Sequence, residues 1–80
     1  MKLSLLGFGI VKDVFGATNI FFDMPDLTTS HDLKESLCIA YPELSKLRSF
    51  MIAVNNNYVP DDHVIHSSDE IAIIPPVSGG

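Results

Sequence analysis

The chain has 80 residues, which suffices for one small domain but not for two. A hydrophobic fraction of 46% against 19% charged residues indicates a globular chain and excludes a disordered tail protein. Ten acidic and five basic residues give a formal net charge of −5, which argues against nucleic-acid binding and favours basic protein partners. The single cysteine excludes an internal disulfide, so we expect a reducing compartment.

The apolar stretch near the N-terminus is the only segment that resembles a targeting signal. It is short, it is followed by Lys12 and Asp13, and it lacks a small-residue cleavage site. No apolar run approaches the roughly 18 residues of a membrane span. We therefore expect a retained strand, no membrane association and a cytoplasmic location.

The first 25 residues predict two strands around a short helical turn. Residues 3–8 alternate like a β-strand. Residues 11–15 form a helical turn that Gly16 is suited to end. Residues 18–24, rich in aromatic and β-branched side chains, form a second strand that Pro25 terminates.

A main helix is expected to begin near Thr29, because Thr29 and Asp32 have capping-box spacing. Apolar residues then recur every three or four positions along one stripe: Leu33, Leu37, Ala40 or Tyr41, Leu44 and Leu47. Pro42 interrupts this pattern, so we expect the helix to end near Ala40 and a separate turn to begin at Pro42.

The last third predicts two more strands. Residues 50–54 form a strand, and three asparagines at 55–57 form a turn that leads into a short return strand. A polar loop over residues 61–68 precedes the final strand at 71–74. This order of elements predicts an α+β domain over residues 1–74, in which one mixed sheet packs on one main helix.

No catalytic or metal-binding constellation is evident within this domain. His63 and His66 are three residues apart, but no other His or Cys completes a metal site, so we interpret both as surface residues. Cys38 is better interpreted as a small core residue than as a nucleophile, because nothing near it in sequence lowers its pKa.

The C-terminal segment has a different character. It consists of Pro75, Pro76, Val77, Ser78, Gly79 and Gly80. The prolines remove two backbone donors and favour an extended path, so the last strand cannot continue. The final glycines have no side chains and fit a channel too narrow for a Cβ atom. We interpret residues 75–80 as a tail that projects by roughly 20 Å, rather than as a frayed terminus.

The reactive group of such a tail would be the Gly80 carboxylate. A carboxylate that is ionised at neutral pH is a poor electrophile and needs activation, most simply as an acyl-adenylate. Sulfur or an amine can then displace AMP. The pattern therefore predicts a carrier whose terminal group is delivered into the site of a partner.

The sequence resembles the small, sulfur-carrier subunits of molybdopterin synthase, the MoaD family of ubiquitin-like β-grasp proteins. Four parts of the chain carry the resemblance: residues 74–80, Phe8 with residues 11–16, residues 53–55 followed by Tyr58 and Val59, and residues 69–71. The triple asparagine at 55–57 is less usual in the family. His66, Ser67 and Ser68 depart from the family, which usually has an Asp-Gly turn there.

The resemblance implies a mechanism in which this chain is not an enzyme on its own. An adenylating enzyme related to ubiquitin-activating enzymes would use ATP and Mg²⁺ to adenylate Gly80, which is then converted to a thiocarboxylate. The tail, with Pro75, Pro76, Val77, Ser78 and Gly79, would enter the large synthase subunit of a heterotetramer and donate sulfur to cyclic pyranopterin monophosphate. The isolated chain would bind no cofactor or metal, and the large subunit would supply the catalytic groups.

The resemblance also implies a docking surface formed by Phe8, Tyr58 and Ile74. By strand parity, Phe8 lies opposite Leu3 and Leu5. In the same way, Ile74 lies opposite Ile71 and Ile73. If the helix covers one sheet face, Phe8 and Ile74 share the uncovered face, where Tyr58 can join them. The alternative is that these side chains fill a second small core.

Three alternatives to the molybdopterin pathway remain. The chain could carry sulfur for another product such as thiazole, although the residues before the terminal glycines fit that branch less well. It could instead be a protein modifier whose Gly80 forms an isopeptide bond with a lysine. It could also be a binding module with an inert tail.

Overall fold

The computed structural model describes residues 1–47 and 49–76, which form five strands, two α-helices and one 3₁₀-helix. In chain order these are β1 (Lys2–Gly7), α1 (Ile10–Phe15), β2 (Asn19–Asp23), α2 (Ser30–Ala40), η1 (Pro42–Lys46), β3 (Met51–Val54), β4 (Asn57–Tyr58) and β5 (Ile71–Ile74). Every element expected from the sequence is present, and the differences are confined to element ends.

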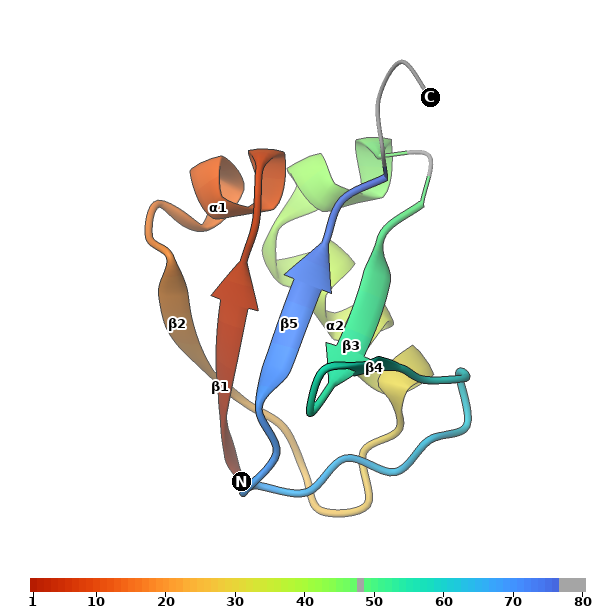
Figure 1. The fold of residues 1–80 in the computed structure, drawn as a ribbon. Coiled ribbons are helices and arrows are strands. Elements are labelled where there is room, and N and C mark those ends of the chain that lie inside the picture. Colours follow the sequence, from red (N-terminus) through yellow and green to blue (C-terminus); the bar gives the residue numbers. More distant parts are fainter. Residues whose placement is uncertain (48, 77–80) are drawn as a thin grey trace.

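The strands form one mixed sheet in the order β2-β1-β5-β3-β4. The central pair, β1 and β5, is parallel, and the other neighbouring pairs are antiparallel. Figure 1 shows the helices on one side of this sheet, with α2 behind β5 and β3, and no helix on the side that faces the viewer. The predicted α+β architecture, one mixed sheet on one main helix, is confirmed.

The ends of the helices follow from local chemistry. The capping box is present: the Asp32 N–H donates to the Thr29 hydroxyl, and the Thr29 N–H donates to the Asp32 carboxylate, each at 3.2 Å. Gly16 ends α1 in the left-handed conformation, with φ 76°. Asn55 and Asn56 also have positive φ, as the predicted asparagine turn requires.

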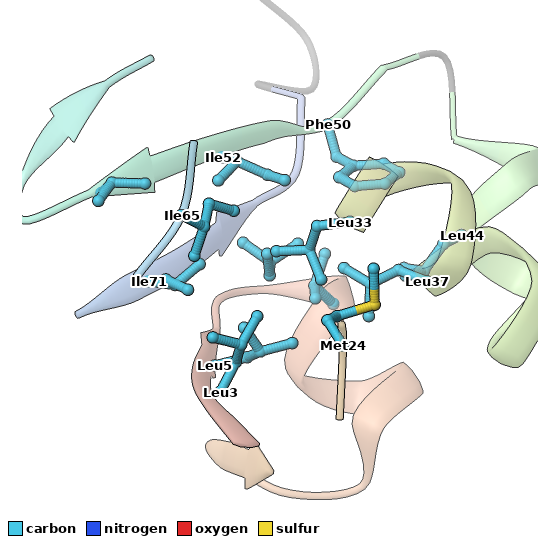
Figure 2. Close-up of a cluster of buried hydrophobic side chains, with 13 residues drawn as sticks. Leu3, Leu5, Met24, Leu33, Leu37, Leu44, Phe50, Ile52, Ile65 and Ile71 are labelled. Atoms are coloured by element: carbon cyan, nitrogen blue, oxygen red, sulfur yellow. The ribbon is translucent and has the colours of Figure 1, made fainter. Parts of the chain in front are cut away.

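The core lies between the sheet and α2 (Figure 2). Its completely buried aliphatic side chains come from both layers: Leu3, Leu5, Val11, Leu33, Leu37, Leu44, Ile71 and Ile73. Of the two candidates for one stripe position, Tyr41 is partly buried and Ala40 is exposed. The Tyr41 ring packs against the Phe15 ring in a tilted arrangement, with centroids 5.0 Å apart. Cys38 is partly buried against the same cluster.

The loop over residues 61–68 contributes to the core, which its polar composition does not suggest. Ile65 is 1% exposed, and its N–H donates to the Thr28 carbonyl at 2.8 Å. The Ser30 N–H donates to the His63 carbonyl at 2.9 Å, so the loop is tied to the start of α2. Ser67 and Ser68 lie in a turn that is closed by Asp69, whose N–H donates to the His66 carbonyl.

No helix in the part of the chain that the structure describes is long and apolar enough to cross a membrane.

Candidate functional site

The open face of the sheet carries a shallow hollow of about 230 Å³. It is lined by Phe8, Ala53, Asn56, Tyr58, Glu70, Ala72 and Ile74. Ala53 pairs with Ala72 on β5 and with Tyr58 on β4, so the two alanines lie at its centre. Because both alanine side chains are small, they leave space between the larger side chains around them.

The structure brings together the three residues expected at a docking surface. Phe8 is 49% exposed and Tyr58 is 63% exposed, while Ile74 is partly buried. With this much exposure they do not form a second buried core. Protein-binding surfaces typically have several exposed apolar side chains next to a hollow. Their role in docking stays a prediction.

Asn55 holds the rim of this hollow in place. Its side chain donates to the Asp69 carboxylate and accepts from the Glu70 N–H, each at 3.0 Å, and its own N–H donates to the Glu70 carbonyl at 2.8 Å. These bonds join the β3–β4 turn to the start of β5. They place Glu70 and Tyr58, which are far apart in the sequence, on the same rim.

Asn56 and Glu70 are rim residues that the sequence pattern does not single out. From the sequence alone, Glu70 is interpreted as an ordinary charged loop residue, and Asn56 is interpreted as a turn residue. The only sequence signal for Glu70 is its place beside Asp69 in the family-like segment before the last strand. Glu70 is the one charged residue that lines the hollow among those described, and it gives this surface a negative edge.

The base of the tail lies at the end of the sheet where β5 stops and β1 leads into α1 (Figure 1). Pro75 and Pro76 follow Ile74 directly and are partly buried. Val77, Ser78, Gly79 and Gly80 lie outside the described residues. Their predicted parts in tail insertion, and the chemistry predicted for Gly80, therefore remain predictions, as does the division at residues 74 and 75.

No group of three or more His, Cys, Asp or Glu within residues 1–47 and 49–76 is placed to hold a metal ion. His31 does lie near two carboxylates. It contacts Glu35 on the next turn of α2, and its Nδ1 is 4.0 Å from an Asp61 carboxylate oxygen. Both contacts are exposed, and the one with Asp61 joins α2 to the loop over 61–68.

Residues 8–80 match the model of the ThiS family. A molybdopterin synthase sulfur carrier subunit from Dictyostelium discoideum is 46% identical over 83 residues, which cover 99% of this chain and 96% of that relative.

Three solved structures share the fold. A putative molybdopterin converting factor subunit 1 from Pyrococcus furiosus has a TM-score of 0.86 and 21% identity, over 96% of this chain and 99% of its own. A protein–protein complex of subunits 1 and 2 of the molybdopterin-converting factor from Helicobacter pylori gives a TM-score of 0.68 at 23% identity, over 100% of both chains. A ubiquitin from Caldiarchaeum subterraneum gives 0.67 at 15% identity, over 100% of this chain and 98% of its own.

The fold is therefore a ubiquitin-like β-grasp with a mixed five-stranded sheet and one main helix. The family match covers most of the chain, and the Dictyostelium relative matches nearly all of it. The chain belongs to the ThiS/MoaD family of ubiquitin-like sulfur carriers. Its function is that of the sulfur carrier subunit of molybdopterin synthase, in molybdenum cofactor biosynthesis.

Proposed function

We propose that this chain carries sulfur as a thiocarboxylate on Gly80, which its partners form and consume. The Gly80 carboxylate attacks the α-phosphorus of ATP, forming an acyl-adenylate and releasing pyrophosphate. Sulfur at the oxidation level of hydrosulfide then attacks the carbonyl carbon, AMP leaves with its phosphate oxygen, and a thiocarboxylate remains on Gly80. ATP and Mg²⁺ belong to the activating enzyme, an E1-like adenylating enzyme, and not to this chain.

In the second stage the tail enters the large subunit of the synthase and gives its sulfur to cyclic pyranopterin monophosphate. The thiocarboxylate sulfur displaces an oxygen substituent, which leaves the pterin. Water then cleaves the bond between sulfur and the carbonyl carbon and restores the Gly80 carboxylate. Two such rounds supply the two sulfur atoms of the dithiolene. The catalytic groups for this step lie on the large subunit, and we place the whole exchange in the cytoplasm.

The observation that carries this proposal is the position of the base of the tail. Strand β5 ends at Ile74, which lines the open-face hollow, and the tail begins at the next residue. A partner that covers Phe8, Tyr58 and Ile74 therefore lies beside the base of the tail and can receive the rest of it. The subunit 1–subunit 2 complex from Helicobacter pylori supports the large subunit as that partner.

Intact-protein mass spectrometry tests the chemistry. The full chain is co-expressed with its activating enzyme, and a variant without Gly80 serves as the matched control. We expect one oxygen at Gly80 to be replaced by sulfur in the full chain and no change in the control. Adducts on the lysines of other proteins would instead identify a protein modifier, and no change with a competent activating enzyme would indicate an inert tail.

A further inference from the structure

The turn that links β1 to α1 depends on Gly9. The Val11 N–H donates to the Phe8 carbonyl at 3.0 Å, which closes a four-residue turn over residues 8–11. Gly9 is its first central residue, with φ 54° and ψ −129°. These angles match the first central position of a type II′ turn, where glycine is strongly favoured because an L side chain is strained.

Gly9 lies against the first residue of the tail. The parallel β1–β5 register pairs Gly7 with Ile73, and the Phe8 N–H donates to the Ile73 carbonyl at 3.3 Å. Two residues further along each strand, a Cβ atom on Gly9 would lie 3.2 Å from the Pro75 Cγ. This distance is tighter than an ordinary Cβ contact, so Pro75 would have to give by a few tenths of an ångström, through its ring pucker or its backbone.

A hollow of about 370 Å³ surrounds this contact. It is lined by Gly9, Ile10, Leu47, Pro75 and Pro76. Ile10 begins α1, and Leu47 follows the last turn of η1, so two separate elements supply its walls. All five lining residues are apolar. Gly9, Ile10 and Leu47 therefore present apolar surface to the same space as the two prolines.

We propose that Gly9, Ile10 and Leu47 form a seat for Pro75 and Pro76 that sets the direction in which the tail leaves the domain. Gly9 is a positioning residue: it acts through Pro75 and does not touch the reacting atoms. The inference rests on the proposed function, since direction matters only if Gly80 must reach a reaction centre. Residues 75–80 span up to roughly 20 Å, so a small change of angle at Pro75 moves the tip much further than the base.

The chain offers a matched control for this seat. Gly16 also has positive φ, 76°, but no atom lies within 4 Å of the position of an added Cβ. Gly9→Ala and Gly16→Ala both introduce backbone strain, so both variants should lose stability in urea unfolding. Only Gly9→Ala also pushes on Pro75.

Two readouts on the full chain separate the seat from simple loss of stability. In NMR spectra of the free protein, we expect NOEs between the Gly9 Hα and Pro75 Hγ protons in the wild type and in Gly16→Ala. In steady-state thiocarboxylation by the activating enzyme, Gly9→Ala should lower kcat about tenfold and leave KM within about twofold, because misplaced reacting groups slow the reaction while the docking face is intact. Gly16→Ala should change neither constant by more than about twofold.

If Gly9→Ala does not fold, Ile10→Ser, which alters only a half-exposed wall of the seat, should still lower kcat at constant KM. Absence of the Gly9–Pro75 NOEs in the wild type would overturn the seat, as would equal kcat for the two glycine variants. A wild-type chain that shows the NOEs but is never thiocarboxylated would instead contradict the proposed function and leave the contact itself established.

Discussion

The two faces of the sheet differ sharply although the same strands form both. On the face toward α2, Ile71 and Ile73 of β5 are completely buried. On the open face, Ala72 and Ile74 of the same strand are only partly buried and line the hollow. Because side chains alternate along a strand, neighbouring residues of β5 point to opposite faces of the sheet. One face stabilises the domain, and the other stays available for recognition.

A second contrast separates the domain from its tail. We find no catalytic constellation in the described residues, and the proposed chemistry lies entirely on one terminal carboxylate. This division suits a chain of 80 residues, whose thin core leaves little room for a buried active site. The four predictions below test whether stability, docking and chemistry are separable, as these contrasts imply.

The largest expected effect is on chemistry alone. Deletion of Gly80 should abolish sulfur transfer completely. The variant still ends in a carboxylate, but its tail is one residue too short to bring that group to the reaction centre. The midpoint of urea unfolding should stay unchanged, because the core in the described part of the chain is formed by residues of the domain. Molybdopterin formation with the large subunit measures the first outcome. Residual activity above the level without carrier would contradict the assignment of Gly80.

Two adjacent isoleucines test the division between the faces. Ile73→Ala should lower the free energy of unfolding by about 3 kcal/mol, because it leaves a cavity in the core. Ile74→Ala should cost below about 1 kcal/mol, since its side chain is only partly buried on the open face. Urea denaturation of both variants checks this. Equal losses would show that the open face also contributes to the core.

Phe8→Asp tests whether the hollow is a docking surface. It should weaken binding to the large subunit by about 2 kcal/mol, roughly 30-fold, while the unfolding midpoint changes little. Phe21→Asp is the matched control, because Phe21 is 67% exposed on β2 and does not line the hollow. Isothermal titration calorimetry measures both affinities. Loss of folding in Phe8→Asp without a separate binding defect would reject the docking role.

The smallest effect is expected at the start of α2. Thr29→Ala removes the hydroxyl that accepts from the Asp32 N–H and should cost about 1 kcal/mol of stability. Affinity for the large subunit should not change, because this residue does not line the hollow on the open face. Thermal unfolding and the same calorimetric titration provide the two measurements.

Local patterns in the sequence were sufficient to predict the secondary structure. The capping box at Thr29 and Asp32, the glycine at position 16 and the break at Pro42 act within a few residues, so their outcome can be predicted without the tertiary fold. Ile65 could not be assigned in the same way. It lies in a polar loop, and its burial depends on contacts with Thr28 and the core, which are distant in sequence.

The sequence by itself determined the α+β class, the faces of β1 and β5, and the proline–glycine character of the tail, since these depend on alternation and on backbone chemistry. Only the tertiary structure decided where these parts meet. The β3–β5 pairing brings Ala53 beside Ala72 and opens the hollow, and the parallel β1–β5 pairing brings Gly9 against Pro75. Both contacts join residues that are far apart in the sequence, so no local pattern predicts them. They depend on strand pairing, which is determined by the packing of the whole core.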